Sequence, residues 1–297
     1  MTATFDYNTA FQRTLGWVTE RELERIRNST VAIAGLGGVG GAHLLTLARL
    51  GVGHFHIADF DIFELHNMNR QAGATMSRLG QPKLDALAEM ALDINPELEI
   101  RRFPEGVTAA NLPNFLAGVD IYLDGLDFFA FEIRRQLFAA CQDNGIPAVT
   151  AAPLGMGAAL VNFLPGGMRF DDYFQFSDGL SVHELSLRFM MGLAPAMLQM
   201  GYLVDPSRVD LAGQRGPSTP MACELCAGLA GTEVLKLLLG RGRVRAAPRG
   251  LHFDAYRGRL ARTWRPGGNA NPIQKLMLVI ARKRLTSSAS MRSGLVR

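Results

Sequence analysis

Apolar and polar positions follow two alternating spacings along the first half of the chain. Continuous apolar runs at residues 30–34 and 55–58 predict buried strands, and residues 43–50 between them have helical spacing. The alternation continues with helices predicted at 83–93, 109–117 and 128–144, and strands at 98–103, 120–123 and 148–151. Strands separated by helices form parallel sheets. We therefore predict an α/β fold: a Rossmann-like, doubly wound, largely parallel sheet with helices on both faces.

The two ends of the chain have less regular patterns. Thr19 and Glu22 match a capping box for a helix that runs to Arg27, and we expect the mixed residues 5–17 before it to lie on the surface. The later segments predict a strand at 158–163, a Met-rich helix at 184–200, a helix at 227–240, a small β extension within 250–264, a basic helix at 272–285 and a disordered tail at 287–297.

A glycine-rich turn joins the first predicted strand to its helix. Gly35, Gly37 and Gly40 fit the pattern G-x-G-x-x-G, and Gly38 is an additional glycine. Glycines here let the backbone approach a phosphate closely, and the amides at the start of the next helix attract the anion. Asp59 ends the second predicted strand, 24 residues after Gly35. A ribose-binding acid is expected at about this place.

The stretch after Asp59 distinguishes ATP from a dinucleotide. The sequence DFD at 59–61 is followed by NMNRQ at 67–71 and PK at 82–83. A hydride-transferring domain has no need for Arg70 and Lys83 directed at its nucleotide. An enzyme that attacks the α-phosphate of ATP needs such cations, because charge builds up on the phosphates as pyrophosphate leaves.

Together these motifs resemble the ThiF/MoeB/HesA family of adenylyltransferases, which are relatives of the ubiquitin-activating enzymes. The resemblance rests on GLGGVG at 35–40, DFD, NMNRQ, PK and a later DGLD at 124–127, and it covers roughly residues 5–240. It implies that ATP, with Mg²⁺, adenylates a carboxylate. The substrate would be the C-terminus of a ubiquitin-like sulfur-carrier protein or a peptide.

The resemblance also implies roles in the nucleotide site. Asp59 would hold the ribose, Arg70 and Lys83 would neutralise the β- and γ-phosphates, and Asn67 would orient them. The other motif positions expected in this site are Gly35, Gly37, Gly38, Gly40, Asp61, Asn69 and Gln71.

Three further residues depend on the resemblance. Asp127 would organise the magnesium ion; its alternative role is a cap for the helix that follows. Arg13 would reach into the ATP site of the partner subunit in a two-fold homodimer. His66 stands where the family usually has a small polar residue, so its role is open.

The chain departs from the family pattern in two places. Phe128 and Phe129 follow the DGLD motif, where the family usually has Asn and then an Arg one turn later. The family's zinc Cys-x-x-Cys, and its frequent acceptor thiol, are missing between residues 165 and 221, so zinc is not expected. Cys223-x-x-Cys226 opens the helix at 227–240. Its thiols are open to three interpretations: buried and inert, redox-active or acyl-accepting, or part of a metal site completed by other ligands.

Composition predicts where the protein is found in the cell, and the motifs predict how the chain is divided. The 297 residues are 48% hydrophobic, with no secretory signal and no apolar run of 18 residues, so we expect a cytoplasmic protein without a transmembrane segment. We divide it into an N-terminal arm and helix (1–29), an ATP-binding core (30–165), a crossover, substrate-side part of the same domain (166–265), and a basic helix and tail (266–297).

The basic end of the chain is a separate feature. Residues 241–297 contain 14 Lys/Arg and one acid, a net +13, which leaves −9 for residues 1–240 because the whole chain carries +4. This segment is either a solvated tail or a site for an anionic partner such as tRNA or lipid. Its predicted helix has one apolar stripe, formed by Ile273, Leu276, Met277 and Ile280. Such a helix lies on a membrane surface, docks on a partner or packs on its own domain.

Four functions stay open at this point. The first is activation of a carrier protein, and the second is adenylation of another carboxylate, on a peptide or on a tRNA nucleoside as in the family's cyclases. The third is an NAD-dependent oxidoreductase, against which Arg70 and Lys83 argue. The fourth is a non-catalytic nucleotide-sensing scaffold, suggested by the altered residues after Asp127.

Overall fold

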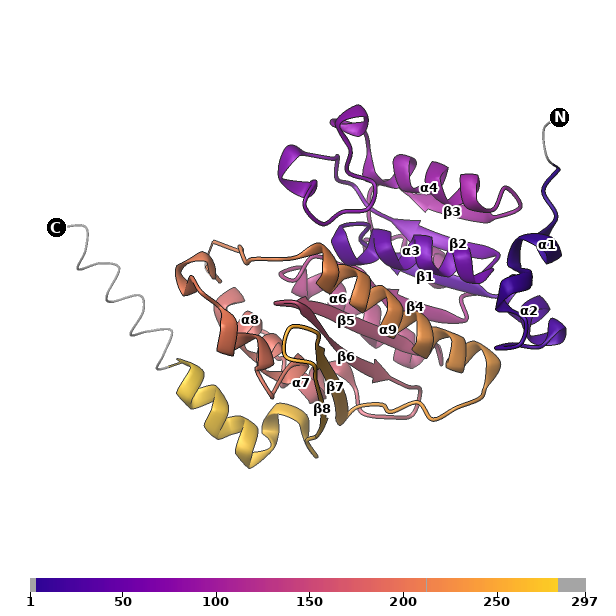
Figure 1. Ribbon diagram of the computed structural model, residues 1–297. Helices are drawn as coiled ribbons and strands as arrows, with labels where there is room; N and C mark the ends of the chain where they lie inside the picture. Colours follow the sequence, from indigo (N-terminus) through magenta and orange to yellow (C-terminus); the bar gives the residue numbers. More distant parts are fainter. Residues whose placement is uncertain (1–3, 212, 283–297) are drawn as a thin grey trace.

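The computed structural model describes residues 4–211 and 213–282, which form an eight-stranded sheet with helices on both faces (Figure 1). The strand order is β3-β2-β1-β4-β5-β6-β7-β8. The strands are β1 (Thr30–Ala34), β2 (His54–Ala58), β3 (Glu99–Phe103), β4 (Ile121–Asp124), β5 (Ala148–Leu154), β6 (Gly157–Phe163), β7 (Arg249–Asp254) and β8 (Arg259–Trp264). Strands β1 to β5 are parallel, whereas β6, β7 and β8 run antiparallel to their neighbours. The predicted α/β class with a β extension is confirmed.

Most of the helices lie where the apolar spacing predicts them. They are α1 (Tyr7–Phe11), α2 (Glu20–Arg27), α3 (Gly38–Leu50), α4 (Lys83–Ile94), α5 (Leu112–Leu116), α6 (Phe131–Asp143), α7 (Phe170–Phe174), α8 (Val182–Leu193) and α9 (Pro220–Leu239). The capping box at the start of α2 is formed as expected. Among the described residues, no helix combines the length and the apolar character needed to cross a membrane.

Both faces of the parallel strands β1, β2, β4 and β5 are buried, which explains their continuous apolar runs, whereas β3 at the edge of the sheet is largely exposed. Val31 and Ile33 of β1 face the core cluster that contains the inner sides of α3 and α9. Ala32 and Ala34 face the opposite cluster, which contains the inner side of α6. In Figure 1, α3 and α9 lie in front of the sheet and α6 behind it. The sheet therefore has two cores, one on each face.

The expectation that residues 5–17 lie on the surface is wrong for the aromatic residues of α1. Tyr7 and Phe11 are buried in the same core as β1, and the Tyr7 hydroxyl donates a hydrogen bond to the carbonyl oxygen of Gly51 at 2.5 Å. The physical reason is their spacing. Residues four positions apart share one face of a helical turn, so α1 can bury both rings together.

The single helix predicted at 184–200 is also wrong. Helix α8 ends at Leu193, and Leu198–Tyr202 form a separate 3₁₀ helix. Pro195 explains the break, because proline offers no amide hydrogen and clashes with the preceding turn. Met191 is buried against Leu187, while Met200 is exposed, so the methionines do not share one face.

The chain after β8 is attached to α7 and α8 by buried side-chain amides. Asn269 donates to the carbonyl oxygens of Phe174 and Arg188, both at 2.9 Å, and Gln274 donates to that of Met191 at 2.9 Å. Residues 272–282 are helical, and we call them the C-terminal helix. Leu278 of this helix is buried in a small apolar cluster with α8. The rest of the predicted helix and the tail at 287–297 lie outside the described residues.

Candidate nucleotide site

The glycine turn after β1 is a backbone-only contact between three segments. The Gly35 amide donates to the Ala58 carbonyl oxygen at 2.8 Å, and Gly35 has a left-handed φ of +81°. A Cβ atom on Gly40 would lie 1.8 Å from the Gly35 carbonyl oxygen, and one on Gly125 would lie 2.4 Å from it. Only glycine fits at these places, so the loop after β4 closes directly on the loop after β1.

Helix α3 starts at Gly38, inside this turn, and not at residue 43 as predicted. Four glycines with low helix propensity hide the start from pattern analysis. The first amides of the helix have no acceptor within it, so they face the crevice at the carboxyl ends of the strands. This is the geometry that binds a phosphate group.

A second helix begins at the same place. Cys223, in the first turn of α9, has its Sγ 2.9 Å from the position that a Cβ on Gly38 would take. Further along, Gly231 of α9 lies against Thr46 and Leu47 of α3. The two helices therefore run parallel, and both positive N-terminal ends of their dipoles meet at the glycine turn.

Asp59 is tied to this turn by both carboxylate oxygens. One accepts a hydrogen bond from the Leu36 amide at 2.6 Å and the other from the Asp61 amide at 2.8 Å. Burial raises the pKa of Asp59 above its usual value, and the two amide hydrogen bonds act in the opposite direction. The carboxylate therefore holds the turn in position at the predicted ribose end of the site.

Lys83 extends the same network. Its side chain is almost fully buried, and its Nζ pairs with an Asp61 carboxylate oxygen at 2.9 Å. The Lys83 amide also donates to the Asp61 carbonyl oxygen at 2.9 Å. The structure thus links Lys83 through Asp61 and Asp59 to Leu36 of the glycine turn.

The NMNRQ residues lie on the loop between β2 and α4. Asn67 is buried, and its Oδ1 accepts a hydrogen bond from the Glu64 amide at 2.9 Å, so here it orders the loop itself. Arg70 donates to Asn69 Oδ1 at 3.0 Å, and its Cγ lies 3.3 Å from the Cβ position of Gly38. Gln71 is buried, and its Oε1 has no hydrogen-bond partner among the described residues, which leaves an acceptor beside the glycine turn.

The other residues of this loop lie further out. Asn69 donates to the Ser218 carbonyl oxygen at 3.1 Å and so connects the loop to the segment before α9. His66 is exposed, and its Nδ1 lies 3.5 Å from a Glu64 carboxylate oxygen. Gly37 also lies in the turn, and a Cβ atom placed on it would lie 3.8 Å from Nε2 of Gln71.

The DGLD motif follows β4 and contains one buried and one exposed carboxylate. Asp124 is buried and pairs with Arg134 at 2.9 Å, and it also accepts a hydrogen bond from the Thr150 hydroxyl at 2.8 Å. Asp127 is exposed at the mouth of the crevice, where its Oδ1 accepts the Phe129 amide at 3.0 Å. The helix cap given as its alternative role is not formed, because the N-cap of α6 is Ala130 and no side chain caps that helix. The second carboxylate oxygen of Asp127 is left for a cation or a ligand.

Arg134 stands near the family's usual arginine position, but sequence reasoning did not predict its role in the site. It donates to Asp124 and to the carbonyl oxygens of Leu126 and Asp127, at 2.9 and 2.8 Å, so it holds the whole loop. We read it as displaced from the family's arginine position. The available signal was an arginine at helical spacing on an otherwise apolar face of α6.

The Cys223-x-x-Cys226 pair is buried in the structure. Burial raises the pKa of the Cys223 thiol, and it raises that of Cys226 well above its usual value. The lowering expected from a helix N-terminus is therefore outweighed, and the inert interpretation is favoured. Among the residues that the structure describes, no three His, Cys, Asp or Glu side chains gather to hold a metal ion.

Aromatic rings occupy the region where the family usually has its zinc pair. Phe170 stacks on Phe138 of α6 with ring centroids 4.3 Å apart, and Phe189 of α8 lies 5.7 Å from Phe131. The Arg134 guanidinium lies over the Phe189 ring at 4.9 Å. Helices α7 and α8 are therefore held against α6, which follows the DGLD loop, by ring contacts.

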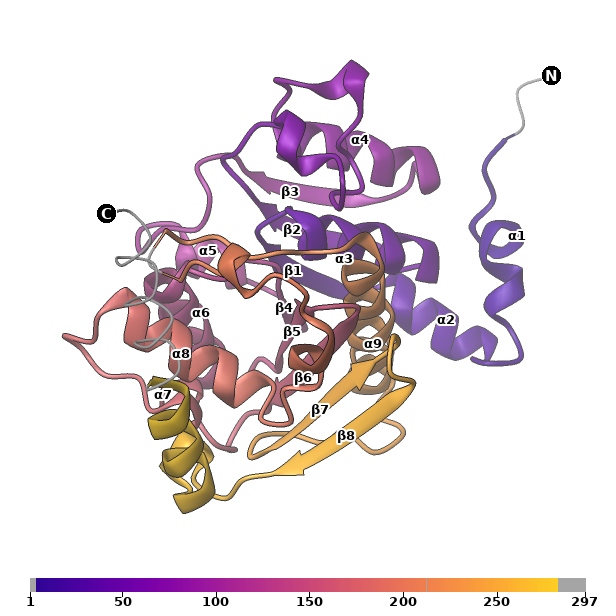
Figure 2. The same cartoon turned by 60° about the vertical axis from the view of Figure 1, so that its left-hand side comes forward.

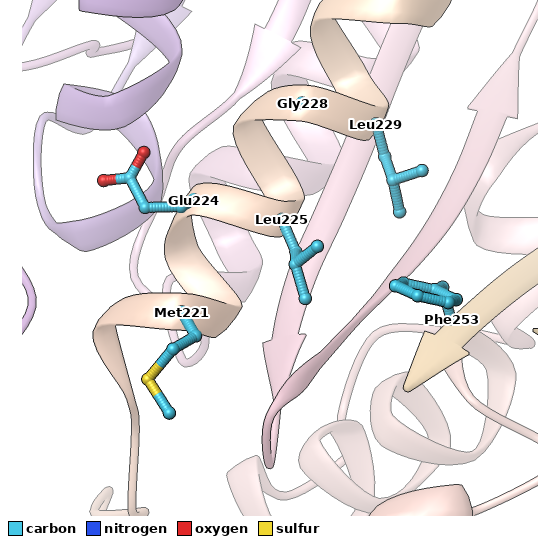
Figure 3. Close-up of a pocket in the computed structure, with 6 residues that line it drawn as sticks. All are labelled: Met221, Glu224, Leu225, Gly228, Leu229 and Phe253. Carbon is cyan, nitrogen blue, oxygen red and sulfur yellow. The ribbon is translucent and has the colours of Figure 1, made fainter. Parts of the chain in front are cut away.

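Two grooves flank the site. One of about 420 Å³ lies beside the DGLD loop, and its lining includes Thr108, Phe129 and Gln136. The other, of about 530 Å³, lies between α9 and β7 (Figure 3). Figure 3 shows that Met221, Leu225 and Leu229 of α9 and Phe253 of β7 line it, with Glu224 at one side.

The fold is an α/β sheet with a glycine turn at the carboxyl end of β1. The chain belongs to the ThiF family, whose model matches residues 10–274. It is 38% identical over 138 residues to the tRNA threonylcarbamoyladenosine dehydratase of Bacillus subtilis (strain 168). The matched residues make up 46% of this chain and 52% of that protein. It is 34% identical over 140 residues to the molybdopterin-synthase adenylyltransferase of Escherichia coli (strain K12), which covers 47% and 55%. The chain spans about half the length of these curated relatives.

Solved structures share the fold. The crystal structure of PaaA has a TM-score of 0.65 at 19% identity, covering 89% of this chain and 77% of that one. The Escherichia coli tRNA N6-threonylcarbamoyladenosine dehydratase, TcdA, has a TM-score of 0.58 at 20% identity, covering 81% and 98%. At these identities the likeness concerns the fold alone.

Arg134→Met should destabilise the protein by about 3–5 kcal/mol, because it leaves Asp124 buried without its cation. Urea unfolding measures this loss. Arg135→Met is the matched control. Arg135 pairs with Asp171 and the exposed Asp178 near the surface, so we expect a loss below about 1 kcal/mol. Equal losses in the two variants would contradict a central role for Arg134.

Cys223 and Cys226 should resist alkylation in the native protein at neutral pH, because burial shields both thiols and raises the pKa of each. Mass spectrometry after iodoacetamide treatment measures modification, and urea-unfolded protein gives the fully modified reference. Rapid labelling of native Cys223 would instead identify a reactive thiolate.

Proposed function

We propose that this protein adenylates a carboxylate with ATP. The observation that carries the proposal is the continuous network from the glycine turn through Asp59 and Asp61 to the buried Lys83, with the exposed carboxylate of Asp127 across the crevice. A cradle for phosphate and a cation beside it are needed where pyrophosphate leaves. A hydride-transferring enzyme has no use for the lysine.

In the proposed reaction, a carboxylate oxygen of the substrate attacks the α-phosphorus of ATP. A new O–P bond forms, the bond from that phosphorus to the β-phosphate oxygen breaks, and pyrophosphate leaves with its electron pair. The amides of Gly38 and its neighbours hold phosphate oxygens, Asp59 holds the ribose, and Arg70 and Lys83 offset the charge of the leaving group. Positioning and charge stabilisation supply the rate.

Magnesium fits this site without a preformed cage. Mg²⁺ is usually held by one or two carboxylates together with substrate phosphates and water, so the exposed Asp127 alone is a sufficient protein ligand. The ion would supply charge neutralisation on the phosphates. Asn67 supports the site indirectly, because its side chain orders the loop that carries Arg70.

The carboxylate belongs to a protein or peptide C-terminus in the first form of the proposal. A relative named sulfur carrier protein ThiS adenylyltransferase, from Escherichia coli (strain K12), supports this form at 32% identity over 142 residues. The second form is a carboxylate on a tRNA nucleoside, and the similarity to the tRNA threonylcarbamoyladenosine dehydratase supports it. Both forms share the same acyl-adenylate chemistry.

Lys83→Met should lower ATP–pyrophosphate exchange by about 100-fold or more, because one charge that stabilises the leaving group is lost. Arg78→Met is the control: Arg78 lies five positions away and pairs with Glu89. Exchange is measured with Gly-terminated carrier proteins, peptides and tRNA as acyl donors.

Calorimetry should show that the wild-type protein binds MgATP in preference to NAD. Tight NAD binding without ATP binding would favour the oxidoreductase alternative.

We also propose a two-fold homodimer in which Arg13 acts on the partner's site. Arg13 lies just before Trp17, and Arg241, after the end of α9, pairs with Glu22 at 3.0 Å and donates to the Trp17 carbonyl oxygen. The start of α9 lies at the glycine turn instead. A helix of 20 residues spans about 30 Å, so Arg13 is far from its own glycine turn.

In a dimer, Arg13 of one copy would lie near the glycine turn of the other copy. Met221 of α9 is exposed and lines the groove of Figure 3, and the exposed Leu260 of β8 pairs in register with Phe253 of the same groove. Trp17 is 82% exposed. A two-fold axis perpendicular to α9 sets the two copies of this helix antiparallel. The end near Arg13 of one copy then meets the glycine turn of the other.

Arg13→Ala should bind ATP but adenylate about 10³-fold more slowly, as expected for an arginine that stabilises phosphate charge late in the reaction. Mixing this variant with Lys83→Met tests the geometry. Each mixed dimer has one site with both defects and one with none, so exchange should recover to roughly a quarter of wild type in an equal mixture. Mixed dimers that form and stay inactive would show that Arg13 does not act across the interface.

A further inference from the structure

The C-terminal helix is attached to the domain by one face only. Gln274 and Leu278 are buried against α8, and Arg282 donates from its Nε to a Glu184 carboxylate oxygen at 3.1 Å. Asn269, just before the helix, is buried as well and bonds to α7 and α8. These polar contacts fix the orientation of the helix, so the direction in which its other face points is determined.

The opposite face of this helix is apolar and exposed. Leu276 is 61% exposed and Ile273 57%, and Val279 and Ile280 are exposed as well. Ile273, Leu276 and Ile280 follow helical spacing and form one stripe. The predicted stripe also included Met277, which instead packs against the cluster with α8. The prediction that this helix packs on its own domain is confirmed, but through Gln274, Met277 and Leu278 and not through this stripe.

The segment that carries the stripe is basic in sequence, although Arg282 of the helix is paired with Glu184 of α8. Residues 255–297 contain ten Lys/Arg and no Asp or Glu. Lys275 is exposed on the helix itself. Both views place this helix at the opposite end of the molecule from α1 and α2 (Figures 1 and 2). The stripe therefore needs a partner that is both anionic and able to take up aliphatic side chains.

These two requirements distinguish between the anionic partners. A nucleic acid offers phosphates, but the exposed side chains of the stripe are all aliphatic, without the aromatic rings that stack on bases. A bilayer surface with anionic lipids offers headgroup charge for the basic residues and acyl chains for the stripe. We propose that the C-terminal helix lies in the surface of an anionic membrane, with Ile273, Leu276, Val279 and Ile280 directed into the bilayer.

The length of the helix agrees with binding in the plane of the surface. Residues 272–282 span about 16 Å, roughly half of the hydrocarbon core, so the described part of the helix lies on the bilayer and does not cross it. The buried amides of Asn269 and Gln274 would hold the domain in one orientation on the membrane. This inference is independent of the proposed adenylation.

The test is flotation of the full chain with vesicles of phosphatidylcholine alone or mixed with phosphatidylglycerol. The wild type should float with the anionic vesicles, less at high salt, and weakly with neutral ones. The double variant Leu276→Glu with Ile280→Glu should lose binding by roughly 10-fold or more, because charge replaces two inserted side chains. Met76→Glu is the control, since Met76 is similarly exposed on the distant 3₁₀ helix Met76–Arg78.

Several outcomes would overturn the proposal. They are absence of wild-type flotation, equal flotation of the double variant and wild type, and a change of oligomeric state in the double variant, which would show that a second copy covers the stripe. Tight binding of tRNA without flotation would assign the basic segment to nucleic acid. Circular dichroism and thermal unfolding verify that each variant is folded, and Lys275→Glu separates the charge contribution from the apolar one.

Discussion

The structure depends on a contact between backbone atoms at the carboxyl ends of β1 and β4. The Gly35 carbonyl oxygen lies so close to Gly40 and Gly125 that a side chain at either position would overlap it. This closeness lets α3 begin inside the turn and brings its first amides to the crevice. Everything placed around the crevice, including Asp59 and the start of α9, is positioned against this contact.

A buried ion pair supports the same crevice from the other side. Arg134 and Asp124 are both nearly inaccessible, and the arginine also holds the carbonyl oxygens of the DGLD loop. Removing two charges from water is costly, so such a pair contributes more to positioning than to net stability. The pair fixes Asp127 at the mouth of the site, where its carboxylate faces outward.

Ring contacts and buried side-chain amides hold together the described part of the second half of the chain. Phenylalanine rings join α7 and α8 to α6, and the side-chain amides of Asn269 and Gln274 join the last helix to α8. Ring contacts are numerous and tolerate changes in neighbouring residues, whereas each buried amide requires its partner. The altered residues Phe128 and Phe129 belong to this aromatic packing, since Phe128 lies 5.2 Å from Phe189.

The sequence by itself determined the elements and the motifs that depend on local order. Continuous apolar runs predicted the central parallel strands, the capping box predicted α2, and the spacing of glycines predicted the turn after β1. The nucleotide that these motifs imply stays a prediction. Tertiary structure alone decided the burial of Tyr7 and Phe11, the role of Arg134, and the meeting of Cys223 with Gly38. These features depend on which distant segments pack together, and the local spacing of residues does not indicate long-range packing. The C-terminal helix shows the division clearly: its pattern revealed an apolar stripe, but only the docked structure showed that this stripe faces outward.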